Sequence, residues 1–149
     1  MENKRLYGRI CCLHRCMSRE NGLLFAEYGI TPVQMDALVF VMFQNKNGKN
    51  VCQKDVERYL RLRASSVSTL ITALERKGFL TRTVSDGDAR TKYITLTDEG
   101  MLLCNKNKIL MDKCDGLVQS ALTEEEQEIL ISFLNKIMAK IDKQEKEVK

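Results

Sequence analysis

The sequence predicts a mainly α (α+β) fold, in which one small β-hairpin interrupts a set of helices. Over most of the 149 residues, apolar side chains recur three, four or seven positions apart, as on amphipathic helices. Residues 84–97 are the exception, because a turn, Asp86-Gly87-Asp88, precedes an alternating run that is typical of a strand. With 44% hydrophobic and 30% charged residues, the composition is that of a folded globular protein.

The first predicted helix ends near Gly29 and has one apolar stripe. The stripe consists of Leu6, Ile10, Leu13, Met17, Leu24 and Tyr28. A second helix, to about Gln44, starts with an unusually complete signal, since Thr31 is an N-cap, Pro32 occupies the first helical position and Gln34 completes a capping box.

Two short helices are expected after the polar turn of residues 45–50. The first is "CQKDVERYL", and the connector 61–63 leads to the second, "ASSVSTLITALERKG", which Gly78 ends. The back of the second helix is apolar (Val67, Leu70, Ile71, Leu74), and its front carries hydroxyl groups (Ser65, Ser66, Ser68, Thr69, Thr72). This pair has the form of a helix-turn-helix, and the strands "FLTRTV" and "TKYITLT" of the hairpin follow directly.

Two long helices are expected at the C-terminal end. Thr97 is the predicted N-cap of the first, with Asp98 and Glu99 in its first turn, and Thr123 and Glu126 form a capping box for the second. Their apolar stripes are Leu103, Leu110, Cys114, Leu117 and Ala121 in one, and Leu130, Leu134, Ile137 and Ile141 in the other.

The positive charge lies in the middle of the chain. Residues 49–97 carry 10 basic and 5 acidic side chains, whereas residues 98–149 carry 8 and 11. A local surface for a polyanion is therefore expected.

Two features fit the grooves of DNA. Small hydroxyl side chains on the front of a helix allow close approach to base edges in a major groove. Arg90 on the hairpin, braced by Asp88, would reach a minor groove. Alternatively, Arg90 only pairs with Asp86 or Asp88 to hold the turn.

Residues 53–100 resemble the winged helix-turn-helix of the MarR family of bacterial transcriptional regulators. The motifs that carry this resemblance are "LERKGFLTR", the "DxR" of Asp88 and Arg90, and "ITLTDEG". It implies one MarR-like domain over residues 1–149, with a DNA-binding part at 32–97 and dimerisation helices at 1–30 and 98–149. Two-fold symmetry would place two recognition helices in successive major grooves, roughly 34 Å apart, on a pseudo-palindromic operator.

The resemblance implies a homodimeric, sequence-specific DNA-binding regulator, more often a repressor, that a small-molecule effector releases from double-stranded DNA. The expected DNA-binding residues are Arg63, Ser65, Ser66, Ser68, Thr69, Thr72, Arg76, Arg82, Asp88, Arg90 and Lys92. An effector pocket of the family type would draw on Tyr28, Met35, Phe43 and Tyr59.

Two alternative hypotheses remain for the function of this chain. Cys16 lies one position before the place of the reactive cysteine in redox-sensing members of the family, and Cys52 takes the place of a helix cap, so either thiol is a candidate redox sensor. A winged helix used only for protein contacts is the other alternative. No metal site is expected from "CCLHRC", because one straight helix cannot direct four ligands to one point.

An enzyme is not expected. His14 is the only histidine, and the sequence contains neither CxxC nor paired catalytic carboxylates, so no cofactor is expected either. There is no run of about 18 apolar residues and no signal peptide, which predicts a cytoplasmic protein with no membrane partner and with reduced cysteines.

Overall fold

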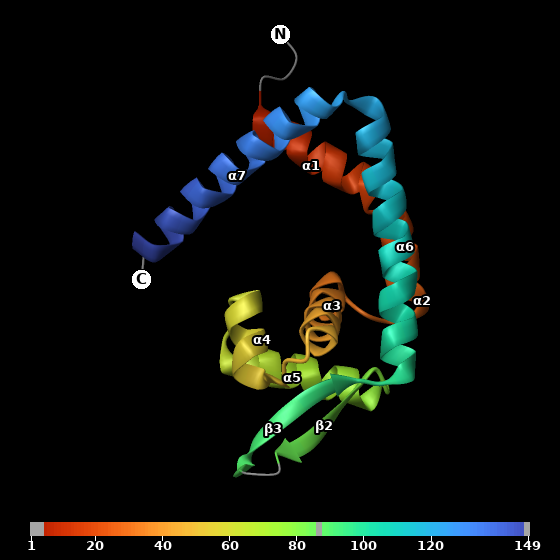
Figure 1. Ribbon diagram of the computed structural model, residues 1–149, viewed down its shortest axis with the longest axis vertical. Coiled ribbons are helices and arrows are strands. Elements are labelled where there is room, and N and C mark those ends of the chain that lie inside the picture. Colours follow the sequence, from red (N-terminus) through yellow and green to blue (C-terminus); the bar gives the residue numbers. More distant parts are fainter. Residues whose placement is uncertain (1–4, 86–87, 148–149) are drawn as a thin grey trace. The chain divides into compact units, whose positions relative to one another are not determined.

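The computed structural model describes residues 5–85 and 88–147, excluding the side chains of residues 85, 88–91 and 145–147. Seven helices and three short strands make up this part of the chain, which confirms the predicted fold class (Figure 1). In chain order they are α1 (Leu6–Met17), α2 (Arg19–Glu27), α3 (Pro32–Lys46), β1 (Val51–Cys52), α4 (Gln53–Leu60), α5 (Ala64–Arg76), β2 (Leu80–Ser85), β3 (Asp88–Leu96), α6 (Asp98–Ala121) and α7 (Glu124–Glu147).

The chain divides into two compact units, one up to Leu110 and one from Met111. The buried core lies in the first unit, where α3, α4 and α5 pack with the sheet. Its largest fully buried side chains are Met35, Leu38, Ile71, Leu74, Leu80, Ile94 and Leu103. The second unit contains the end of α6 and all of α7.

The sheet is antiparallel, with β3 in the middle of the order β1-β3-β2. Leu80 pairs with Leu96 at the base of the hairpin, and Val51 of β1 pairs with Ile94 on the other side of β3. We call β2 and β3 the wing. The register of the wing shifts between Val84 and Ser85.

The helix starts that were predicted from capping residues are confirmed. Gln34 N donates to Thr31 Oγ1 at 3.2 Å and Thr31 N donates to Gln34 Oε1 at 3.0 Å, so the first capping box is complete. The same reciprocal pair joins Thr123 and Glu126, at 2.9 and 3.3 Å. These boxes form because they join residues three apart, which are neighbours in any helix.

Two elements differ from the prediction. The helix expected from Leu6 to Gly29 is broken at Ser18, which lies between the end of α1 and the start of α2. The backbone N–H of Ser18 donates to His14 O at 2.8 Å. Strand β1 was not predicted, because two residues carry no periodicity and their pairing with Tyr93 and Ile94 joins distant parts of the sequence.

The start of α6 packs directly against the end of α5. Gly78 adopts φ +77°, as expected for the residue after a helix, and Phe79 O accepts a hydrogen bond from Thr97 N at 3.2 Å. Gly100 N donates to Thr97 Oγ1 at 3.1 Å, which confirms Thr97 as the N-cap. A β-carbon on Gly100 would lie 2.0 Å from Phe79 O, so only glycine fits at this junction.

Candidate nucleic-acid interface

The turn between α4 and α5 is tight because Arg61 adopts the left-handed conformation, with φ 54° and ψ 38°. Leu62 N then bonds back to Glu57 O at 3.3 Å, as in a helix C-cap. Gln53 links the two helices, since its Nε2 donates to Glu57 Oε1 at 2.9 Å and to Ala64 O at 3.3 Å. These contacts hold the two helices as a helix-turn-helix.

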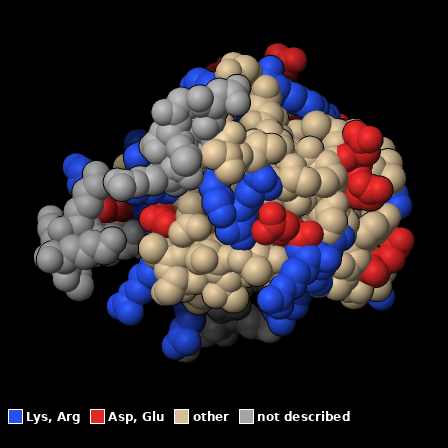
Figure 2. All heavy atoms as spheres, turned by 90° about the horizontal axis from the view of Figure 1, so that it is seen from below, with Lys and Arg blue, Asp and Glu red and all other residues tan. Residues whose placement is uncertain are grey.

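Helix α5 presents a polar stripe away from the core. Its apolar back is buried, with Val67 and Leu74 at 0% exposure. Steps of four, three and four residues place four polar side chains on the opposite face. This front stripe consists of Ser65, Thr69, Thr72 and Arg76, of which all but the half-buried Thr72 are exposed. From below, Figure 2 shows Lys and Arg side chains spread over the surface, with Asp and Glu groups among them.

Arg82 connects the wing to α5. Its Nη2 donates to Thr72 Oγ1 at 2.7 Å, and its Nε lies 3.2 Å from Glu75 Oε2, with the Arg82 side chain only 22% exposed. The sequence analysis named Arg82 as a DNA-binding residue, but it did not predict these partners within the protein. We call this contact the Arg82 bridge; it fixes the orientation of β2 against the helix front.

The remaining predicted DNA-binding residues belong to α5, its N-cap and the wing. Arg63 is the exposed N-cap of α5, Ser66 is exposed and Ser68 half-buried on its sides. Lys92 is exposed on β3, where it pairs with Val84 of β2. Asp88 and Arg90 belong to β3 by their backbone, but their side chains lie outside the described residues.

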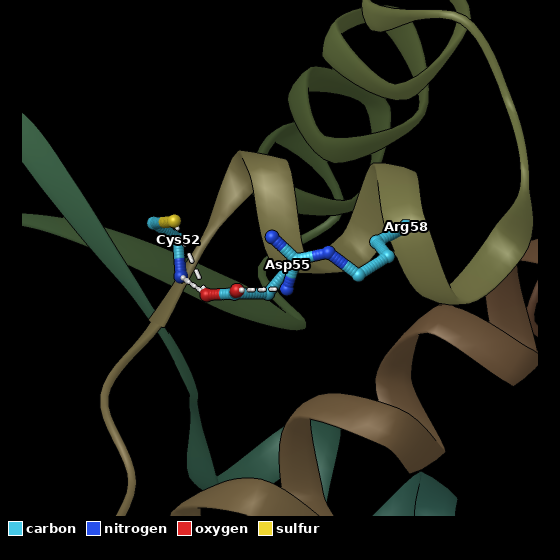
Figure 3. A network of polar contacts seen from close by, with 3 residues as sticks. All are labelled: Cys52, Asp55 and Arg58. Carbon is cyan, nitrogen blue, oxygen red and sulfur yellow. Dashed lines mark hydrogen bonds and ion pairs between the residues drawn. The ribbon is translucent and has the colours of Figure 1, made fainter.

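Cys52 is held by hydrogen bonds at the start of α4 (Figure 3). Both its N–H and its thiol donate to Asp55 Oδ2, at 3.0 and 3.1 Å, and Arg58 Nη1 lies 3.3 Å from Asp55 Oδ1. The backbone N–H of Cys52 is the main cause that lowers the pKa of Asp55; the thiol and the Arg58 guanidinium act in the same direction. The thiol thus serves as a donor in a helix cap.

Replacing Asp55 with Ala should reduce the free energy of unfolding by about 1 kcal/mol at pH 7, because the cap of α4 is lost. The lowered pKa means that the ionised carboxylate contributes stability above the unfolded value of about 3.9 and loses it as the pH falls through the folded value. Urea unfolding of both proteins at pH 7 and pH 3 checks this, since the difference should shrink at pH 3. Arg58→Ala is the control, and a larger loss in that variant would contradict the assignment.

The four residues expected in an effector pocket do not converge. Met35 is buried in the core, Phe43 is 63% exposed, and Tyr28 contacts Phe79 and Lys106. Tyr59 lines a cavity of about 420 Å³ between α3, β1 and α4, in which its ring stacks on Phe40 at 4.3 Å. A second cavity, of about 550 Å³, lies between α4, α5 and the sheet.

The six cysteines differ in exposure, and Cys52 and Cys114 are half-buried. Cys104 is buried, and burial raises the pKa of its thiol to about 11, so that it packs as an apolar side chain. Cys11, Cys12 and Cys16 are exposed on α1.

Within the described residues, no group of three or more His, Cys, Asp and Glu side chains is arranged to hold a metal ion. None of the helices in this part of the chain is long and apolar enough to cross a membrane.

Residues 28–91, which include α3, the helix-turn-helix and the start of the wing, match the model of the MarR family. The HTH-type transcriptional regulator YdcH of Bacillus subtilis is 30% identical over 82 residues, which are 55% of this chain and 56% of that protein. PrsX of Escherichia coli, also an HTH-type transcriptional regulator, is 27% identical over 59% of this chain and 53% of its own length. The chain thus spans about half the length of these curated relatives.

Solved structures match over nearly the whole chain. The complex of Staphylococcus aureus MepR with DNA superposes with a TM-score of 0.77 and 25% identity, covering 93% of this chain and 99% of that one. MepR bound to ethidium bromide gives a TM-score of 0.66 and 26% identity over 94% of this chain and 98% of its own. Sequence and fold point the same way: residues 28–91 match the MarR family model, and the whole chain resembles the winged helix-turn-helix structures of MepR.

Proposed function

We propose that this chain is a sequence-specific DNA-binding transcriptional regulator that acts as a homodimeric repressor and is released by a small-molecule effector. The observation that carries the proposal is the polar front stripe of α5. It faces away from the core because the opposite side of the helix is buried. Side chains of this size and polarity can approach base edges in a major groove. The likeness to the MepR–DNA complex supports this use of the helix.

Exposed apolar surface supports the homodimer. Helix α1 has no buried residue, and in α7 none of the residues 124–144, whose side chains are described, is buried. Half-exposed side chains follow the predicted stripe of α7, with Leu130 at 37% and Ile137 at 42% exposure. Apolar surface of this extent is typical of an interface between protein chains. A second copy would cover it and supply the second recognition helix.

The effector part of the proposal rests on the cavity that Phe40 and Tyr59 line. The stacked rings of Phe40 and Tyr59 offer a flat apolar surface, and Arg58 and Lys49 also line the cavity. A pocket with an aromatic surface and a few polar groups suits a small planar ligand. MepR, a member of the same fold, has been solved with the planar ligand ethidium bromide.

Binding of duplexes selected from a random pool tests the proposal, and two half-sites roughly 34 Å apart are expected. Replacing Arg90 with Ala should weaken binding to the selected operator by about 1 to 3 kcal/mol, as for an arginine that reads a groove. Fluorescence anisotropy at several salt concentrations measures this loss, and affinity should fall steeply with salt because phosphate contacts release counterions.

Lys136→Ala on α7 removes the same charge outside the proposed interface and serves as the control. Its operator affinity should match that of the wild type. Equal binding by the Arg90→Ala variant, with its fold intact, would contradict the role of Arg90. Failure to bind any duplex at low salt would instead favour a winged helix that serves protein contacts only.

A further inference from the structure

Helix α1 carries three exposed thiols that the proposed function does not use. Cys11, Cys12 and Cys16 are all free and exposed. Cys12 and Cys16 are four residues apart, and no other pair of the six cysteines in the sequence has this spacing. Residues at i and i+4 of a helix are neighbours, with about 5 to 6 Å between their β-carbons. Cys12 and Cys16 therefore form a dithiol on one side of α1.

Cys11 belongs to a different side of the helix. At about 100 degrees per residue, it is roughly 140 degrees from Cys16 around the helix axis. Its neighbour is Tyr7, since a hydrogen bond with Cys11 raises the pKa of the Tyr7 hydroxyl. Cys11 is thus an exposed thiol of the same helix without a thiol four residues away, which makes it a natural control.

The dithiol also lies away from the surface that a second copy would cover. The apolar stripe of α1 consists of Leu6, Ile10, Leu13 and Met17, and its centre is roughly 110 degrees from that of the two thiols. Association through this stripe would leave Cys12 and Cys16 open to solvent. A reagent can then reach the two thiols in the assembled protein.

We propose that Cys12 and Cys16 form a capture site for trivalent arsenicals. Thiolates are soft ligands and select soft acceptors. Two thiols that project side by side from one helix can bind a shared atom at an angle close to a right angle, which suits pyramidal As(III). They do not face each other across an ion, as a linear two-coordinate metal would require. Binding needs only these two protein ligands.

The reaction is a condensation without oxidation or reduction. With phenylarsine oxide, both S–H bonds break, two As–S bonds form, and the oxygen of the reagent leaves with the two protons as one water molecule. Arsenic remains trivalent and keeps its phenyl group. The product is a ring that contains arsenic, the two sulfur atoms and the helix segment between Cys12 and Cys16.

Phenylarsine oxide is the probe, and intact-mass spectrometry with free-thiol counting is the measurement. The full-length protein should take up one arsenical, lose two free thiols and keep the adduct in excess monothiol, whereas a small dithiol should remove it. Cys12→Ser and Cys16→Ser should each weaken binding by about a hundredfold or more, because the second thiol no longer acts at a high effective concentration. Cys11→Ser should bind like the wild type.

Retention of the adduct by either the Cys12→Ser or the Cys16→Ser variant would overturn the proposal, as would its loss from the Cys11→Ser variant. An adduct that links two chains would also overturn it, because the site is contained in one helix. Circular dichroism of each variant separates loss of the site from loss of the helix. All three cysteines are exposed, so serine in their place should leave the fold unchanged.

Discussion

Replacing Gly100 with Ala should lower the free energy of unfolding by about 3 kcal/mol or more, as for severe overpacking at a rigid site. The new β-carbon would meet Phe79 O at 2.0 Å and Leu96 Cδ2 at 2.8 Å. The leucine side chain can rotate away, but the carbonyl cannot, because it belongs to the backbone between α5 and β2 and accepts the N–H of Thr97. A decrease of roughly 6 to 12 °C in Tm, measured by differential scanning calorimetry, is expected for a chain of this size.

Gly116→Ala is the matched control, since it is the same substitution within α6. No atom lies within 4 Å of a β-carbon at Gly116, so the helix propensity of alanine should stabilise the protein by about 0.5 to 1 kcal/mol. The two variants should therefore differ in sign. A Gly100→Ala variant as stable as the wild type would show that α6 can start without close contact to Phe79.

Replacing Ile137 with Glu should abolish the proposed dimer and, with it, tight operator binding. Ile137 lies in the middle of the apolar stripe of α7, where association would bury it in both chains. An unpaired buried carboxylate costs several kcal/mol, and two-fold symmetry places two of them in the interface. We expect the dimer dissociation constant to rise by about a hundredfold or more. Sedimentation equilibrium measures the assembly, and anisotropy measures binding to the operator.

The exposed Ser132, on the opposite side of α7, provides the comparison. Ser132→Glu adds the same charge to the same helix and should leave both the assembly and operator affinity unchanged. Unfolding of each variant by urea should show that the core of the first unit is intact, because that core contains no residue of α7. A dimeric Ile137→Glu variant would mean that the interface lies elsewhere.

Features that depend on neighbouring residues could be predicted from the sequence. Both capping boxes, at Thr31 and Thr123, and the N-cap at Thr97 have the predicted partners three residues away. The buried back of α5 followed from its periodicity for the same reason. The break at Ser18 was missed because the apolar stripe continues across it.

Contacts between distant residues could not be predicted in this way. Nothing near Arg82 in the sequence shows that Thr72 and Glu75 would face it, since the pairing depends on how β2 crosses α5. The expected effector residues are scattered for a similar reason. Aromatic and flexible apolar side chains can line a ligand pocket, but they also suit a protein core. Met35, which is 2% exposed, belongs to the core.

The position of β3 in the sheet has a consequence for how this protein can evolve. At its base, Tyr93 and Ile94 pair with β1 on one side and with β2 on the other, whereas towards Asp88 only β2 pairs with it. The base of the wing is therefore held by pairing on both sides of β3, and its far end by pairing on one side only. Substitutions towards the Asp88 end of β3 should therefore cost little stability. Under the proposed function, operator preference can then diverge within a lineage while the scaffold beneath is inherited unchanged.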